Sequence, residues 1–74
     1  MKEVNIGDVV DAVTESGQPV KALVVCVHSQ ECINTVYAST DPAKQDSYGR
    51  QIERMDSLSR KGQSTAPGGR WFEA

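Results

Sequence analysis

Apolar residues gather in the first half of the chain, where their pattern is typical of strands. Two segments, residues 4–14 and 20–28, are rich in valine and isoleucine, which branch at Cβ and favour strands. A turn-forming cluster at residues 15–19 separates them. A third apolar segment, residues 32–39, follows a short polar turn at residues 29–31. The second and third segments therefore predict an antiparallel hairpin.

The second of these segments contains an unbroken apolar run over residues 22–27. A strand with one solvated face would alternate apolar and polar side chains, and this run does not. We therefore expect a strand that is covered on both faces, as in the centre of a small barrel.

The pattern changes after Thr40. Asp41 followed by Pro42 suits a polar turn or a single helical turn near residues 41–48. In residues 51–58 the apolar side chains recur at every third position, which fits neither a regular strand nor a strong helix. We interpret this segment as a bulged strand, with a short helix as the alternative.

The end of the chain combines a loop with two large aromatic residues. Glycine and proline predict a loop over residues 61–69. Trp71 and Phe72 follow, and large aromatic side chains are costly to leave in water. We expect one of them to pack on the core in a last short strand, with Trp71 at least half buried.

These segments together predict a fold. Four or five short strands without a long helix, in 74 residues, predict an all-β or mainly β domain that spans residues 1–74. We expect a small antiparallel barrel of the SH3-like kind. The alternative OB-like barrel is less favoured because the predicted strands are short. A chain of this size buries about 60% of its unfolded surface, which supports one small core and no deep active site.

Charge and hydropathy exclude several classes of protein. The formal net charge is −2, which argues against a nucleic-acid coat protein or a membrane-surface protein. Residues 1–37 carry two cations against five acidic residues, and residues 38–74 carry six against five. No apolar run approaches the roughly 20 residues that span a bilayer, and no secretory signal is visible. We expect a cytoplasmic location.

Two cysteines flank the predicted turn. A hairpin centred on Ser29 would place Cys26 opposite Cys32, whereas a centre half a residue later would place Cys26 opposite Ile33. The sequence leaves both registers open, and we expect reduced thiols. Two cysteines and His28 provide three candidate ligands without the usual paired spacing, so no metal site is predicted.

Catalytic patterns are missing from the sequence. It contains no phosphate-binding glycine loop and no recognisable nucleophile spacing. Asp46, Glu53 and Asp56 are candidates for paired acid–base carboxylates, but each has an arginine nearby in the sequence. Ion-paired surface carboxylates are far commoner than catalytic ones. We expect a protein that is not an enzyme and has no cofactor.

Residues 46–54 bring together side chains that can bind a ligand, namely a tyrosine, two arginines, a glutamine and a glutamate. Arginine binds phosphate or carboxylate through two parallel hydrogen bonds, and tyrosine stacks on a base or fills a pocket. We predict a contact surface for an anionic ligand, such as a nucleotide, or for an acidic protein surface. Its residues are Tyr48, Arg50 and Arg54, with Arg70 as a fourth member if the C-terminus lies alongside.

The same side chains have an internal alternative. Asp46 can pair with Arg50, and Glu53 can pair with Arg50 or Arg54. In that case Tyr48 packs on the end of the barrel, and the stretch is architecture rather than a binding surface.

Three stretches of the chain together resemble known proteins. The run from Val36 to Arg54 reads VYASTDPAKQDSYGRQIER, the opening at Gly7 reads GDVV, and the close at Gly68 reads GGRWF. Together they resemble short proteins encoded in bacteriophage and prophage genomes. The resemblance implies a phage origin and an SH3-like barrel. It implies no activity and assigns no residue a role.

The expected function is therefore that of a phage-encoded binding module. Such a module would interfere with a host or anti-phage defence process by binding a host protein or sequestering a nucleotide, as a monomer or a homo-oligomer. A first alternative is a virion component, such as a head-decoration or connector subunit, because strand edges pair with neighbouring chains. A second is a nucleic-acid-binding barrel, which the acidic first half disfavours.

Overall fold

The computed structural model describes residues 2–62 and 70–74, and these residues form seven strands and no helix. The predicted loop at 61–69 lies largely outside the described residues. In the described part of the chain, no helix is available that could cross a membrane. The strands are β1 (Val9–Val13), β2 (Pro19–Ser29), β3 (Cys32–Ala38), β4 (Gln45–Asp46), β5 (Gly49–Arg50), β6 (Ile52–Arg60) and β7 (Trp71–Glu73).

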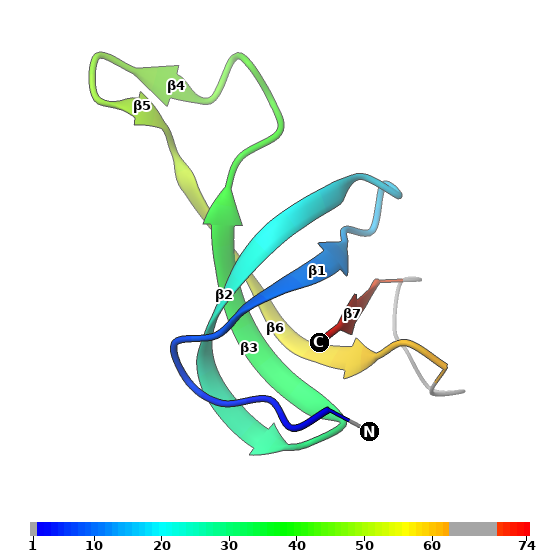
Figure 1. Ribbon diagram of the computed structural model, residues 1–74. Helices are drawn as coiled ribbons and strands as arrows, with labels where there is room; N and C mark the ends of the chain where they lie inside the picture. Colours follow the sequence, from blue (N-terminus) through cyan, green and yellow to red (C-terminus); the bar gives the residue numbers. More distant parts are fainter. Residues whose placement is uncertain (1, 63–69) are drawn as a thin grey trace.

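Five of the strands close into a barrel in the order β1-β2-β3-β6-β7 (Figure 1). Each neighbouring pair is antiparallel except β6 and β7, which run parallel. A ring with an odd number of strands cannot alternate direction all the way round, so one parallel pair is unavoidable. The predicted small all-β barrel is confirmed, and this one pair makes it mixed rather than wholly antiparallel.

The core fills the inside of the barrel, and β2 shows how the sheet divides its residues. Ala22 and Val24 point inward and are buried, whereas Leu23 and Val25 are 42% and 36% exposed. The expectation that this strand is covered on both faces is therefore wrong. A single sheet that curls into a barrel has only one inner face. The fully formed core consists of Val4, Val10, Ala12, Ala22, Val24, Ile33, Met55, Leu58 and Phe72.

The three-residue spacing in β6 comes from a bulge. Thr35 pairs with Met55 and Ile33 pairs with Leu58, so two residues of β6 face Asn34 alone. Ser57 is one of these two, with a φ of 53°, and its N–H donates to Asn34 Oδ1 at 2.9 Å. The extra residue turns Leu58 back into the core beside Met55. The predicted bulged strand is confirmed, and the helical alternative is wrong.

The last strand places its two aromatic residues on opposite faces. Phe72 is fully buried in the core, whereas Trp71 lies on the outer face opposite Val13 of β1. The Trp71 side chain is only partly exposed, and Lys61 Nζ lies 4.8 Å from the centre of its ring. The prediction of a half-buried Trp71 is confirmed, but the aromatic residue of the core is Phe72 because side chains alternate along a strand.

The two cysteines adopt neither of the registers that the sequence left open. Cys26 pairs with Asn34, and Cys32 pairs with Ser29. Irregular pairing after Val24 and again after Val27 shifts the alignment along the hairpin. Both thiols are free and partly buried. Within residues 2–62 and 70–74, no three histidine, cysteine or acidic side chains gather as metal ligands.

One end of the barrel is sealed by the N-terminal segment, and we name it the closed end. Val4 is fully buried there, and the Gln30 side chain both accepts from Val4 N at 2.7 Å and donates to Val4 O at 3.0 Å. Arg60 donates to Gln30 O at 2.8 Å and to Lys2 O at 2.9 Å. Its guanidinium lies 5.0 Å from the centre of the Phe72 ring. These bonds join three segments that are distant in the sequence.

Candidate functional site

A projecting hairpin rises from the other end of the barrel, and we name residues 40–51 the finger. The chain leaves the barrel after β3, forms the β4–β5 hairpin and returns into β6 (Figure 1). Every residue from 40 to 52 is exposed. Tyr48 sits in the turn between β4 and β5, and its side chain is 97% exposed. The finger therefore adds no side chain to the core.

The tip of the finger is ordered by its own short-range bonds. Lys44 N donates to Asp41 O at 3.0 Å, which forms the first turn. Tyr48 N donates to Asp46 Oδ1 at 2.8 Å, so the aspartate side chain supports the tip. Gly49 follows with a φ of 119°, in the left-handed region that favours glycine. These local hydrogen bonds and Gly49 therefore determine the position of Tyr48.

The base of the finger is tied to the barrel by further polar contacts. Ser39 N donates to Gln51 O at 2.8 Å, and Gln51 N donates to Lys44 O at 3.0 Å. Arg50 Nη1 donates to Ser39 O at 3.3 Å. Lys44 Nζ also pairs with Glu53 Oε1 at 2.7 Å. Hydrogen bonds and one ion pair therefore join the finger to the barrel.

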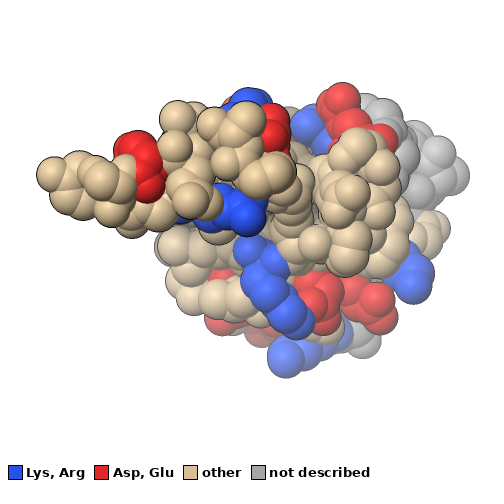
Figure 2. All heavy atoms as spheres, turned by 90° about the horizontal axis from the view of Figure 1, so that it is seen from above, with Lys and Arg blue, Asp and Glu red and all other residues tan. Residues whose placement is uncertain are grey.

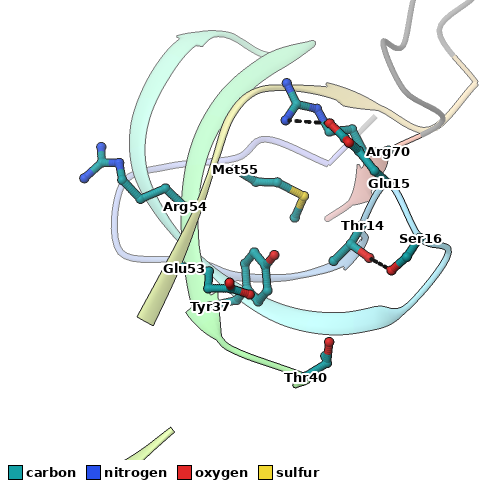
Figure 3. A pocket seen from close by; sticks show the side chains of 9 residues that line it. All are labelled: Thr14, Glu15, Ser16, Tyr37, Thr40, Glu53, Arg54, Met55 and Arg70. Carbon is teal, nitrogen blue, oxygen red and sulfur yellow. Dashed lines mark hydrogen bonds and ion pairs between the residues drawn. The ribbon is translucent and has the colours of Figure 1, made fainter. Parts of the chain in front are cut away.

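A pocket of about 280 Å³ opens at the same end of the barrel, and we name it the mouth pocket. Figure 3 shows Met55 and Tyr37 pointing towards the middle of the barrel, with Arg54 pointing outward. Met55 is a buried core residue, so the pocket lies directly above the core. Its lining residues are Thr14, Glu15, Ser16, Tyr37, Thr40, Glu53, Arg54, Met55 and Arg70.

Two titratable groups of the mouth pocket influence each other. Burial, and next the negative charge of Glu53, raise the pKa of Tyr37 above its ordinary value of 10.0. The hydrogen bond from Lys44 lowers the pKa of Glu53, and the same bond raises the pKa of Lys44. At neutral pH the pocket therefore presents a protonated tyrosine hydroxyl next to an ionised carboxylate.

Arg70 borders the pocket, and only some of its guanidinium nitrogens contact other groups of the described residues. Nη2 donates to Asp56 O at 2.6 Å, and Nη1 lies 3.8 Å from Glu15 Oε1 (Figure 3). The side chain is 20% exposed. Nε is buried, and it has no hydrogen-bond partner among the described residues. A buried N–H without an acceptor costs about 1–3 kcal/mol.

The four residues predicted from sequence fall into two groups at this end of the barrel. Tyr48 and Arg50 belong to the finger, whereas Arg54 and Arg70 border the mouth pocket. Arg54 is an exposed side chain on β6 whose Nε lies 3.8 Å from Asp56 Oδ1.

The internal ion pairs that the sequence left open, of Arg50 and Arg54 with Asp46 and Glu53, do not form. Among the ion pairs of the described residues, Glu53 pairs with Lys44, and neither Arg50 nor Arg54 takes its place. Asp46 accepts a hydrogen bond from the backbone of the tip, and Tyr48 does not pack on the barrel. Sequence reasoning missed Thr14, Tyr37 and Met55 as pocket residues, because they come from separate strands and loops with no shared motif.

Comparisons of the chain with protein-family models, with curated proteins and with solved structures find no match. Of what the resemblance implied, the structure shows a small all-β protein with a closed five-stranded barrel. No relative supports a phage origin, so the function has to be argued from the finger and the mouth pocket.

Proposed function

We propose that this protein is a non-enzymatic binding module that engages a protein partner through the finger. The observation that carries the proposal is the run of exposed residues from 40 to 52, which forms an ordered hairpin outside the core. An isolated two-stranded hairpin is marginally stable in water, and this one gains no apolar burial from the barrel. A binding role explains an ordered excursion of this kind, because binding residues concentrate on loops that a rigid scaffold positions.

The side chains at the tip suit a protein partner. Tyrosine and arginine are enriched among the residues that dominate protein–protein affinity, and Tyr48 and Arg50 stand close together in the hairpin. The finger also carries Asp41, Lys44 and Asp46, so its charges cancel. A neutral projecting hairpin with an aromatic tip fits a cleft in a partner better than a strongly charged surface.

The charge distribution at this end of the molecule favours the same partner class. Figure 2 shows acidic and basic side chains interspersed on the face seen from above, with the finger extending to the left. Proteins that bind a phosphate backbone gather their cations in a continuous patch. The mixed surface supports a protein partner over nucleic acid.

The resemblance to phage and prophage proteins suggests the origin of that partner. Its middle motif, residues 36–54, includes the whole finger. We therefore propose a bacterial host protein as the partner, with the finger blocking a host or defence process. In the alternative that we retain, a virion component, the protein would be found in purified particles by mass spectrometry.

The proposal is tested with finger variants and a matched control. The protein is immobilised, a retained protein from a bacterial lysate is identified and purified, and its affinity is measured by calorimetry. Tyr48→Ala and Arg50→Ala should each weaken binding roughly 30-fold, as expected for residues worth about 2 kcal/mol. Lys21→Ala, which removes an exposed cation of β2, should leave the affinity unchanged.

Stability is measured on the same variants. Tyr48→Ala should unfold at the wild-type temperature, because its side chain is exposed. If both finger variants bind as tightly as the wild type, the finger is not the contact surface and the proposal fails.

A further inference from the structure

Strand β6 has one edge that is open over most of its length. On one side, its pairing with β3 extends from Ile52 to Ser59. On the other side, its pairing with β7 among the described residues involves only Ser59 and Arg60. Residues 52–58 therefore have a strand on one side only within the part of the chain that the structure describes.

The backbone groups that face this open edge follow from the register. Ser39 N donates to Gln51 O at 2.8 Å, so the Gln51 carbonyl points towards β3. The pairing with β3 continues without a shift over residues 52–55. Hydrogen-bonded and non-hydrogen-bonded pairs alternate along an antiparallel ladder, so Ile52 and Arg54 turn their N–H and C=O groups away from β3. Two donors and two acceptors of the backbone thus point to the open edge.

The mouth pocket lies along the same edge. It is lined by Met55, which points into the barrel, and by Arg54, which points outward (Figure 3). Neighbouring residues with opposite side-chain directions share only the two edges of their strand, and β3 occupies one of these. Residues 14–16 line the pocket as well, from the turn that follows β1. A space of about 280 Å³ is therefore open next to the backbone groups of Arg54.

These backbone groups match an extended peptide better than a small molecule. Ile52 and Arg54 are about 7 Å apart along a strand, and a second strand offers its own donors and acceptors at the same spacing. Peptides that add to an exposed strand edge gain affinity from such main-chain hydrogen bonds. A second copy of this chain fits less well, because it would bring a whole barrel to a recess of about 280 Å³.

Arg54 and Met55 determine which peptide fits the edge. The Arg54 side chain is 67% exposed, and its ion pair among the described residues is a long one, 3.8 Å from Nε to Asp56 Oδ1. Opposite charges on neighbouring strands attract, so an acidic residue suits the position opposite Arg54. The next residue of the peptide points to the other face, where Met55 lies, and an apolar side chain suits that position.

We infer that the open edge of β6 binds an extended segment of another protein by strand addition. The bound segment has an acidic residue opposite Arg54 and an apolar residue next to Met55. This contact uses no residue of the finger, so it is a second surface of the molecule. Either contact can fail without the other.

Hydrogen exchange of the ¹⁵N-labelled full chain tests the open edge without any ligand. The Arg54 amide should exchange roughly tenfold or more faster than the Met55 amide, because only Met55 turns its N–H towards β3. Equal protection of the two amides would show that the edge is already paired, within the chain or by a second copy. That result would overturn the inference.

Synthetic peptides then test binding at the edge. The first probe is acetyl-Thr-Val-Glu-Val-Thr-amide, which should shift the Arg54 amide resonance saturably and slow its exchange. A second peptide with lysine in place of the glutamate should bind roughly fivefold more weakly. A third peptide, methylated on the glutamate nitrogen, should not bind measurably, because it lacks the N–H that pairs with the Arg54 carbonyl.

A charge reversal assigns the binding to Arg54. Arg54→Glu should prefer the lysine peptide over the glutamate peptide by a similar factor. Lys2→Glu makes the same kind of charge change at the closed end and should leave the preference for glutamate unchanged. The spectrum of each free variant shows whether it is folded. If Arg54→Glu is not folded, the three peptides on the wild-type chain decide.

Three further results would overturn the inference. The first is that the glutamate peptide leaves the exchange of the Arg54 amide unchanged. The second is that the methylated peptide binds as tightly as its parent. The third is that folded Arg54→Glu keeps the wild-type preference. None of these results bears on the finger, because its test uses a protein partner and the variants of Tyr48 and Arg50.

Discussion

The two ends of the barrel each contain an arginine near the C-terminal strand, and the two side chains are used differently. Arg60, at the closed end, is 8% exposed, donates to two carbonyl oxygens and stacks on Phe72. Arg70, at the open end, makes one hydrogen bond and one long ion-pair contact, and its Nε has no partner within the described residues. Polar groups hold the chain together at one end and remain available at the other.

The chain segments at the two ends differ in the same way. At the closed end the N-terminal segment folds back and buries Val4 completely. At the open end the finger projects from the barrel, with Tyr48 exposed (Figure 1). Because side chains fill the inside of a small barrel, a binding site has to lie at an end or on the outside. The contrast supports the proposal that the open end is the one that binds a partner.

The largest expected effect concerns the core beneath the closed end. Phe72→Ala should lower the free energy of unfolding by about 3–5 kcal/mol, because it removes a fully buried aromatic ring. For a domain whose total stability is about 5–15 kcal/mol, much of the folded state would be lost. Trp71→Ala is the control, since its side chain is partly exposed on the outer face. Urea unfolding that shows an equal loss for both variants would place the core elsewhere.

The two arginines allow a direct comparison of the ends. Arg60→Met should lower the free energy of unfolding by about 2–3 kcal/mol, because two charged hydrogen bonds to backbone carbonyls are lost. Arg70→Met should cost about 1 kcal/mol or less, since one of its N–H groups has no acceptor among residues 2–62 and 70–74. Chemical denaturation of both variants measures the difference. Equal losses would contradict the division into a structural and a functional end.

A smaller effect concerns the hydroxyl of Tyr37. Its pKa is raised by burial and by Glu53, so Glu53→Gln should lower this pKa towards 10.0. The tyrosinate absorbance is followed against pH in a Tyr48→Phe background, where Tyr37 is the only tyrosine. Glu31→Gln, an exposed carboxylate of the β2–β3 turn, should leave the titration unchanged.

The raised pKa of Tyr37 also predicts how the stability of the protein changes at alkaline pH. A folded-state pKa above the unfolded value stabilises the protein fully below pH 10.0, and this stabilisation is lost as the pH rises through the folded pKa. Glu53→Gln should therefore flatten the alkaline loss of stability. A steeper loss in that variant would show that Glu53 does not face the Tyr37 hydroxyl.

How far the sequence predicts this molecule depends on the range of the interactions. The spacing of Met55 and Leu58 indicated the bulge in β6, because a bulge is a local event. The sequence also indicated a polar turn near residues 41–48, but it did not indicate the β4–β5 hairpin that forms there. The sequence did not indicate that the outer face of β2 is uncovered, because barrel closure depends on all five strands.

The remainder of the site depends on contacts between distant residues. Gln30 seals the closed end through Val4, and nothing in the sequence near either residue indicates this pairing. The mouth pocket likewise joins Thr14, Tyr37 and Arg70 from three parts of the chain. Such sites become visible only when the register of each strand is known.

The central claim is that the finger serves binding and not folding, and its removal tests this directly. Ser39 N bonds Gln51 O across the base, so residues 40–50 can be replaced by Asn-Gly, a pair that favours a two-residue hairpin turn. The account predicts an unfolding free energy within about 1 kcal/mol of the wild type, because the finger buries no core residue. It predicts at the same time that binding of the protein partner is lost. A loss of several kcal/mol in urea unfolding, or retained partner binding, would contradict the account.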